Sequence, residues 1–333
     1  MMRNPAIDIM KAIGVFLVIV GHNSSGILNN YIYSFHMPMF FIIAGYLWRE
    51  KNIGVSLLRD CKRLILPYVA YFVIFAIARY IYTGVTVSRV MQTTVMVCWA
   101  SCHRIEIFGH HIQGVGALWF LPALFVCKNI FNAIYVKFGT LTKRLKAQAV
   151  YVCMYVCIGV CAAIGAFIHR KYFPLPFGLS TGMNALVFFC VGHWMKVGLN
   201  EISRLDAIAW FYKTAILIAW GALGWFVRNG MASCEYYHFP LNYVTGVCGT
   251  ILCYYFTTWL YKSAPHLSKA LQTIGQYTIS VLLIHQLVED YGWVIKLDYT
   301  NHFSLISFTI IIALGYVFGH YFITRKIRER SIR

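Results

Sequence analysis

Residues 7–26 read IDIMKAIGVFLVIVGHNSSG, and this stretch decides the class of fold. It is long enough to cross a bilayer as a helix, which takes about 20 mostly apolar residues. Similar apolar runs follow along the 333-residue chain, whose composition is 59% hydrophobic and only 12% charged. Because these runs are continuous and do not alternate with polar residues, they exclude an outer-membrane β-barrel, a disordered chain and a secreted disulfide scaffold.

The apolar runs predict an all-α polytopic membrane protein, a bundle of about ten transmembrane helices that forms a single membrane domain over residues 1–333. The expected spans are 7–26, 31–48, 64–82, 115–136, 147–168, 183–197, 207–227, 243–261, 274–288 and 303–322. Residues 85–99 have the apolar spacing of an interfacial or re-entrant helix. Ten spans leave only short connections, so any chemistry must take place among the helices.

The basic residues predict the orientation of the chain. With the amino terminus inside, the cytoplasmic segments hold nineteen Lys and Arg residues, and the opposite side holds six. Since these residues are enriched on the cytoplasmic side of membrane proteins, we expect both termini in the cytoplasm. The net charge of +18 then reflects loops that face anionic lipid. We therefore expect membrane lipids as partners, and no nucleic acid.

Ionisable residues inside the expected spans are the first candidates for function, because such residues are costly to bury in a bilayer. Lys11 and His22 are eleven residues apart, which returns to nearly the same helix face about 16 Å further along the axis. Asp8 lies one turn before Lys11 and can pair with it. Alternatively, the side chains of Asp8 and Lys11 only reach towards the membrane interface.

The second expected span carries His36, and only residues 23–30 separate this span from the first. Such a short connection predicts a helical hairpin, which places His22 and His36 at similar depth. One imidazole can then act as a general base while the other orients the substrate or the first imidazole. Alternatively, each histidine is a structural residue held by a neighbouring carbonyl.

Five motifs occur in an order that covers nearly the whole chain. They are IDIMKAIGV (7–15) leading to Gly21-His22, YSFHMPMFF (33–41) with Ala44-Gly45, KRL (62–64) with Pro67-Tyr68, LWFLPAL (118–124), and IGQYTIS (274–280) leading to His285. Together they resemble the integral-membrane acyltransferase family three, and most closely its fucose O-acetylase-like branch. Two positions depart from the family pattern. Lys11 stands where arginine is usual, which loses bidentate hydrogen bonding, and Ala44 stands where serine is common.

The resemblance implies an enzyme of the bacterial inner membrane that moves an acyl group, usually acetyl, from cytoplasmic acetyl-CoA to a hydroxyl of a cell-envelope carbohydrate such as a lipid-linked glycan. Catalysis would fall to His22, as general base, and His36. Positive charge suits the CoA phosphates. The candidates for holding the donor are Lys11, Arg59, Lys62 and Arg63. Topology and lipid contact are the alternative explanation for the last three.

Four further residues are candidates for contacting the substrate or lining its cavity. They are Asp8, Trp119, Ser280 and His285. Simple packing is the alternative for Trp119, because aromatic residues in membrane helices commonly pack. For His285 the alternative is a role in anchoring its helix.

No metal site is expected in this chain. His103, His110 and His111 lie in a predicted external loop without regular ligand spacing, and the cysteines that recur every four residues from Cys153 to Cys161 share one helix face and cannot surround an ion. A lipid-linked glycan transporter or flippase is the alternative function, since it also needs many spans with buried polar groups. Such transporters usually show an internal repeat with broken helices, and we find none in this sequence.

Overall fold

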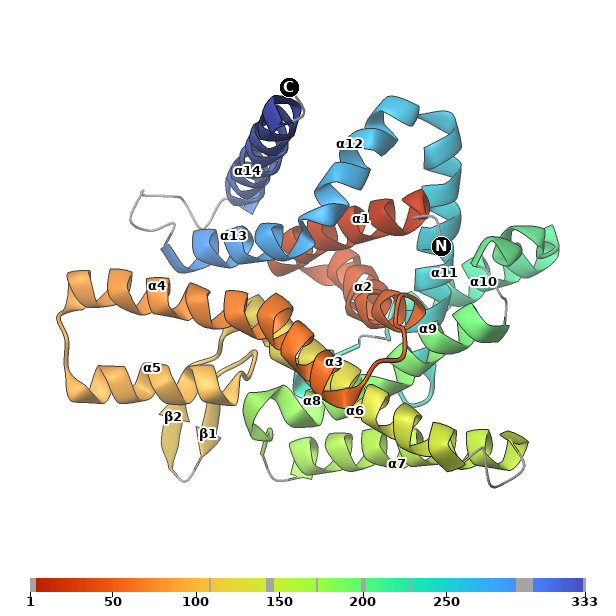
Figure 1. The fold of residues 1–333 in the computed structure, drawn as a ribbon, viewed down its shortest axis with the longest axis horizontal. Helices are drawn as coiled ribbons and strands as arrows, with labels where there is room; N and C mark the ends of the chain where they lie inside the picture. The colour runs from red at the N-terminus through yellow and green to blue at the C-terminus, as the bar shows by residue number, and fades with distance from the viewer. Residues whose placement is uncertain are drawn as a thin grey trace. The chain divides into compact units, whose positions relative to one another are not determined.

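The computed structural model describes residues 4–107, 109–141, 147–171, 173–198, 202–227, 229–236, 238–291 and 302–331. The described part is mainly helical, with one two-stranded hairpin (Figure 1). The chain divides into two compact units. The first comprises Met1–Phe40, Ile208–Arg228 and Pro240–Arg333, and the second comprises Phe41–Ala207 and Asn229–Phe239.

The first unit begins with α1 (Pro5–His22). The side chain of Asn4 accepts a hydrogen bond from the backbone N–H of Ala6 at 3.0 Å and so caps the helix. Pro5 fits the first turn, where its missing N–H would have no partner in the helix. With 18 residues, α1 is about 27 Å long, which is close to the thickness of a bilayer core.

The predicted hairpin of the first two spans is present, since α2 (Gly26–Tyr46) runs back along α1. Gly21 faces Ile32 and Tyr33, and Gly14 faces Met39 and Phe40. The turn between the helices is closed by Asn29, whose amide donates to the carbonyl oxygens of Gly21 at 2.7 Å and Ser24 at 3.0 Å. These bonds fix the residues after His22 against the first turn of α2.

The first unit also contains α10 (Trp210–Gly224), α11 (Leu241–Ser263), α12 (Pro265–Gln276), α13 (Thr278–Tyr291) and α14 (His302–Ser331). Helix α12 approaches α1 backbone to backbone, because a Cβ at Gly275 would lie 1.8 Å from the carbonyl oxygen of Asp8. Trp220 of α10 donates its indole N–H to Ser34 of α2 at 3.1 Å. The expected span 274–288 is interrupted at Tyr277, where α12 ends and α13 begins.

The second unit holds the end of α2 and most elements between it and α10. In chain order they are α3 (Ile53–Asp60), the π-helical turn η1 (Cys61–Ile65), α4 (Leu66–Thr83), α5 (Val87–Trp99), β1 (Ile105–Ile107), β2 (His110–Ile112), η2 (Gly116–Trp119), α6 (Phe120–Leu141), α7 (Ala147–Lys171), η3 (Pro176–Gly178), α8 (Leu179–Asn184), α9 (Leu186–Gly198), η4 (Ile202–Ala207) and, further on, η5 (Met231–Ser233). A Cβ at Gly45 would lie 1.9 Å from the carbonyl oxygen of Phe189, and one at Gly192 would lie 1.9 Å from that of Ile42. The end of α2 and α9 therefore cross in direct backbone contact, which explains why the Ala44-Gly45 motif needs its glycine.

The helix predicted over residues 85–99 is present as α5, and it folds back along α4 (Figure 1). Tyr68 donates its hydroxyl to the carbonyl of Val97 at 2.8 Å, and the hydroxyls of Tyr80 and Thr93 lie 3.2 Å apart. The two helices are thus antiparallel. Helix α4 continues without a break from α3 and η1, so this apolar helix begins at residue 53 and not at 64.

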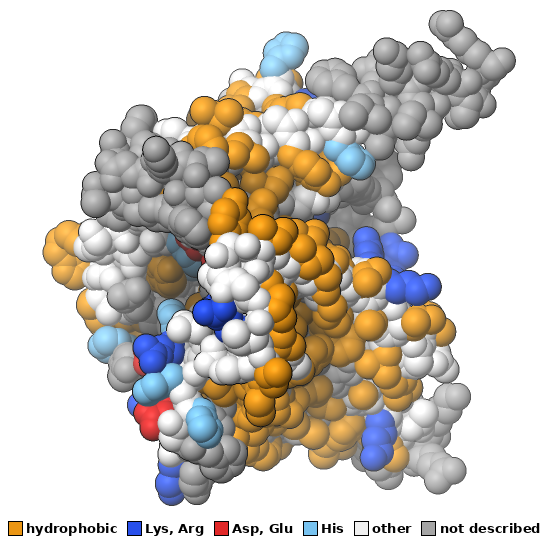
Figure 2. Space-filling view, turned by 90° about the vertical axis from the view of Figure 1, so that its left-hand side faces the viewer, with side chains coloured by type: hydrophobic (Ala, Val, Ile, Leu, Met, Phe, Trp, Pro, Cys, Tyr) orange, Lys and Arg blue, Asp and Glu red, His pale blue; other side chains and the backbone are white. Residues whose placement is uncertain are grey.

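In the described part of the chain, four helices are long and apolar enough to cross a membrane: Pro5–His22, Ile53–Thr83, Gly116–Leu141 and Gln148–Lys171. Two shorter apolar helices are Leu186–Val197 and Leu305–Tyr321. Ile74, Ile77 and Ile81 of α4 are more than half exposed, and Figure 2 shows a broad apolar surface on the face in view. An all-α membrane fold is therefore confirmed, while the number of ten spans stays a prediction. Lys143, Arg144 and Lys146, which we expect in the cytoplasm, lie outside the described residues.

Candidate active site

His22 is the last residue of α1, and its ring lies against α13. Its Nδ1 is 3.2 Å from Oε1 of Glu289, and the same carboxylate oxygen is 3.2 Å from Nε2 of His285. An ionised carboxylate only accepts hydrogen bonds, so the proton between His22 and Glu289 belongs on Nδ1 of the imidazole. This leaves Nε2 of a neutral His22 as the nitrogen that can take a proton.

His285 and Glu289 are four residues apart on α13 and share one face of that helix. The side chain of His285 is fully buried, whereas those of His22 and Glu289 are each 23% exposed. The rings of His22 and His285 meet edge to face, with 5.0 Å between their centroids. These three side chains, the His22–Glu289–His285 cluster, are compact and open to a ligand at His22 and Glu289.

The same cluster is the one group among the described residues that has the donors and spacing to hold a metal ion. Its ligand atoms lie within 4.8 Å of one another, and two imidazoles with one carboxylate are a donor set that zinc accepts. The His22–Glu289 contact of 3.2 Å is also of hydrogen-bond length, so a shared proton accounts for it without an ion, whereas neither ring nitrogen of His285 has a hydrogen-bond partner among the described residues. The expected absence of a metal therefore stays a prediction.

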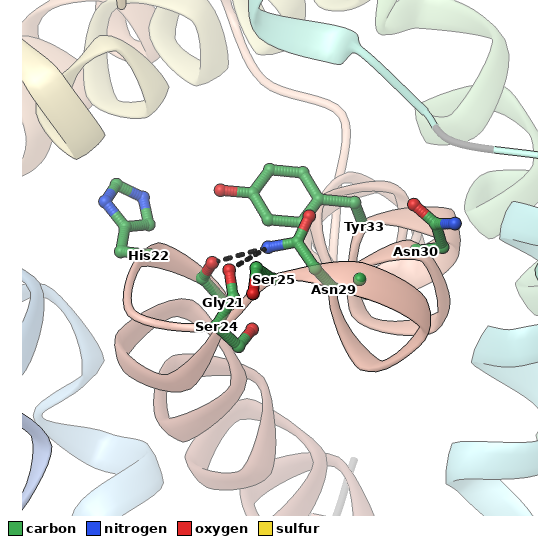
Figure 3. Close-up of a pocket in the computed structure, with 8 residues that line it drawn as sticks. Gly21, His22, Ser24, Ser25, Asn29, Asn30 and Tyr33 are labelled. Carbon is green, nitrogen blue, oxygen red and sulfur yellow. Dashed lines mark hydrogen bonds between the residues drawn. The ribbon is translucent and has the colours of Figure 1, made fainter. Parts of the chain in front are cut away.

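A pocket of about 490 Å³ lies at the end of α1, beside the turn into α2 (Figure 3). Besides His22, the side chains that line it are those of Ser24, Ser25, Asn29, Asn30 and Tyr33. The Oγ of Ser24 is buried and has no hydrogen-bond partner in the described structure. In Figure 3 the ring of Tyr33 extends towards His22. The pocket thus offers uncharged hydroxyl and amide groups to a polar ligand next to the imidazole.

His36 lies on α2, where its Nδ1 donates to the carbonyl oxygen of Ile32 at 2.7 Å. Its ring meets that of Tyr33 edge to face, with the centroids 4.9 Å apart. No hydrogen bond or ion pair of the described residues joins His36 to His22. His36 therefore has the geometry of a histidine held by a neighbouring carbonyl, and it borders the pocket only through Tyr33. Its catalytic role stays a prediction.

Asp8 and Lys11 form the expected ion pair, with 2.6 Å between Oδ1 and Nζ. Asp8 is 4% exposed, because α12 packs on the backbone of α1 at this point. The pair lies near the start of α1, about 16 Å along the axis from His22, and it does not line the pocket beside His22. A donor group bound at Lys11 would therefore lie about 16 Å along α1 from the imidazole of His22.

Neither Trp119 nor Ser280 is among the residues that line this pocket. Trp119 is 6% exposed in η2 of the second unit, and its ring meets that of Phe120 edge to face. Ser280 is half-buried on α13, five residues before His285. Packing explains the environment of Trp119, and substrate contact by either residue stays a prediction.

The three basic candidates for the donor site lie in the second unit, on α3 and η1. Arg59, Lys62 and Arg63 are all exposed. Beneath them, Asp60 is 2% exposed and its Oδ1 lies 2.7 Å from Nζ of Lys128 on α6. The buried Asp60–Lys128 pair fixes this segment to α6 and leaves the basic side chains at the surface. A π-helical turn such as η1 is frequent at functional sites.

Glu289 is the site residue that the sequence analysis missed. The expected ninth span ends at Val288, one residue earlier, so Glu289 falls at a span end where an acidic residue needs no special explanation. The available signal was its spacing, because a carboxylate four residues after His285 lies on the same helix face.

The match to a protein family extends over nearly the whole chain. The model of the acyltransferase domain, Acyl_transf_3, matches residues 4–324. The chain belongs to acyltransferase family three. Proteins of this family are membrane proteins, so the chain is a membrane acyltransferase, and the resemblance found in the sequence is confirmed. Searches of curated proteins and of solved structures found no match. The assignment to the fucose O-acetylase-like branch stays a prediction.

Proposed function

We propose that this acyltransferase moves an acetyl group from cytoplasmic acetyl-CoA to a hydroxyl of a cell-envelope glycan, and that His22 is the general base. The observation that carries the proposal is the contact of 3.2 Å between His22 Nδ1 and Glu289 Oε1 at the wall of a polar pocket. A general base must lie beside the acceptor hydroxyl and must be held in one tautomer. The position of His22 meets both needs.

In the proposed reaction, Nε2 of His22 takes the proton of the acceptor hydroxyl while the hydroxyl oxygen attacks the thioester carbonyl carbon. The carbon–sulfur bond then breaks, and the imidazolium returns the proton to the sulfur of CoA. Glu289 stabilises the imidazolium, because its carboxylate accepts the Nδ1–H bond. His285 lies beside the same carboxylate oxygen, with its Nε2 at 3.2 Å, and its ring meets that of His22 edge to face.

The pocket beside His22 favours an uncharged sugar as the acceptor. Its lining offers Ser24, Ser25 and Asn30, whose groups can donate to and accept from sugar hydroxyls. A buried hydroxyl without a partner, such as Ser24 Oγ, gains most from a ligand that supplies the missing hydrogen bond. The expected topology places residues 23–30 outside the cytoplasm, so the proposal puts acetylation at the outer face of the membrane.

The donor would bind at the cytoplasmic side. Arg59, Lys62 and Arg63 supply positive charge for the CoA phosphates, and Lys11 supplies a further cation near the start of α1. The axial separation of about 16 Å between Lys11 and His22 suits an extended pantetheine arm that carries the acetyl group along α1.

Transfer of label from acetyl-CoA tests the proposal. The purified protein in nanodiscs is incubated with radiolabelled acetyl-CoA and a panel of lipid-linked glycans, and labelled glycan and free CoA are measured. We expect both products in equal amounts. Passage of glycan across the membrane of proteoliposomes without consumption of acetyl-CoA would favour a flippase instead.

The same assay separates general-base catalysis from two other uses of the cluster. A metal-dependent reaction would stop after treatment with a strong chelator and recover with added zinc, whereas we expect no change. A nucleophilic His22 would leave a labelled protein adduct when acetyl-CoA is supplied without acceptor, whereas we expect none.

A further inference from the structure

A cavity of about 520 Å³ in the second unit is not used by the proposed reaction. Three parts of the chain build it: residues 101–106, which lead into β1; residues 169–170 at the end of α7 with residues 173–174 after it; and residues 232–235 around η5. In the expected topology each of these segments is an external connection. The cavity is lined by none of the residues of the pocket beside His22.

Hydrogen bonds fix the walls of this cavity. Trp99 donates its indole N–H to the carbonyl of Pro174 at 2.7 Å, and the backbone N–H of Val115 donates to Ser101 at 2.7 Å. Gly230 and Glu235 exchange two backbone bonds across the third segment. In this segment, burial raises the pKa of the Cys234 thiol to about 12, so the thiol is uncharged. The cavity is therefore preformed.

The lining carries charges of both signs. Arg104 and Arg170 provide guanidinium donors, while Glu106 and Glu235 provide carboxylate acceptors. None of the ion pairs between described residues includes Arg104, Glu106 or Glu235. Arg104, Glu106 and Glu235 thus bring opposite charges to one cavity outside those ion pairs, and a ligand can use them.

A carbohydrate suits this lining better than an ion does. An anion would face two carboxylates and a cation two guanidinium groups, and such like-charge contacts are unfavourable. Sugar hydroxyls donate and accept, so they can satisfy both kinds of group at once. Phe173 and Pro174 line the same cavity and offer an apolar surface to the C–H face of a sugar ring.

We propose that this cavity is a second glycan-binding site, separate from the pocket beside His22. The inference rests on the proposed function, because it assumes that the acceptor is a glycan of several sugars.

Direct binding of glycans tests the site without any acetyl transfer. The probes are fluorescent oligosaccharides of two to eight sugar units, neutral and acidic, offered to the full-length protein in nanodiscs without acetyl-CoA. The probes that bind to the unmodified protein are then offered to Arg104→Gln and Glu106→Gln. We expect each variant to bind these probes about tenfold more weakly, because each substitution removes a charged hydrogen-bonding group.

Two matched controls lie next to the cavity without lining it. His111 stands opposite Glu106 in the β1–β2 hairpin, and Lys171 follows Arg170 and places its ammonium over the ring of Phe167. We expect His111→Gln and Lys171→Gln to bind the probes as the unmodified protein does. The melting temperature of each variant checks its folding, and Glu235→Gln replaces a variant that fails this check.

Unchanged binding by the folded cavity variants overturns the inference, and so does the absence of glycan binding by the unmodified protein. Failure of the proposed function has a different result. Glycan that binds in a manner sensitive to Arg104 and Glu106, but never receives acetyl from acetyl-CoA, supports the cavity and contradicts the reaction.

Discussion

In the proposed reaction, Glu289 decides which nitrogen of His22 acts as the base. Its carboxylate accepts a hydrogen bond from Nδ1–H. This bond becomes stronger when the ring gains a positive charge, because a hydrogen bond to a charged group contributes about 1.5–3 kcal/mol. The ring of His285 is fully buried and contacts both partners, with its Nε2 at 3.2 Å from the same oxygen of Glu289 and its centroid 5.0 Å from that of His22. The proposed base therefore depends on the carboxylate of Glu289 as much as on the imidazole of His22.

Glu289→Gln should lower kcat for acetyl transfer by at least tenfold, because an amide can present its N–H to Nδ1 and favour the wrong tautomer. The KM for acetyl-CoA should not change. Steady-state kinetics check both values. Asp290→Asn is the matched control, since Asp290 is the next residue and accepts a bond from Gln286 at 3.1 Å. A wild-type kcat in folded Glu289→Gln would remove Glu289 from the mechanism.

Neutralising Lys62 and Arg63 should raise the KM for acetyl-CoA by about tenfold, which corresponds to the loss of one charged hydrogen bond. The KM for the acceptor should stay the same, because the proposed acceptor site has no part in binding the CoA phosphates. Lys269→Gln, which removes another exposed basic residue, serves as the control. An unchanged donor KM would assign these charges to topology alone.

At the scale of elements, glycines set the closest helix contacts. Gly275→Ala should destabilise the protein, because the new Cβ would lie 1.8 Å from the Asp8 carbonyl and force α12 away from α1. Overpacking of this kind costs about 1–3 kcal/mol. A fluorescence-based melting curve measures the loss. Gly315→Ala in α14 is the control, since nothing lies within 4 Å of its added Cβ. Equal melting temperatures of Gly275→Ala and the unmodified protein would show that α12 can move away from α1 without a loss of stability.

Apolar runs predicted where helices exist but not where they end. Residues 53–63 fall in an expected cytoplasmic connection, yet they continue into α4 as one helix. The break at Tyr277 has no glycine or proline to mark it, since Gly275 lies inside α12. Helix ends of this kind depend on packing between segments, and such packing cannot be predicted from a single sequence.

At the scale of the whole molecule, the excess of basic residues in alternate connections predicts both termini in the cytoplasm. Activity reporters fused at Asn29 and after Arg333 should therefore report opposite sides of the membrane. Arg333 lies outside the described residues, so this prediction comes from the sequence alone. Reporters that show the same side would contradict an even number of spans.

The candidate site was predictable as far as it is local in sequence. The Asp8–Lys11 pair follows from spacing on one helix, and the structure contains it. The contact of His22 with Glu289 joins α1 to α13 across most of the chain, and the cavity lined by Arg104 and Glu106 joins three separate connections. Long-range contacts of this kind depend on how the helices pack, so only the structure reveals them.

The rate of acetyl transfer by His22→Ala tests whether His22 is the general base. General-base catalysis is worth roughly 10²–10⁴ in rate, so the variant should lose at least a hundredfold in kcat while it still folds and binds acetyl-CoA. His266→Ala, which removes an exposed histidine on α12, should keep the full rate. A properly folded His22→Ala variant that transfers acetyl at the unmodified rate would contradict the account, and the base would then have to be sought at His36 or His285.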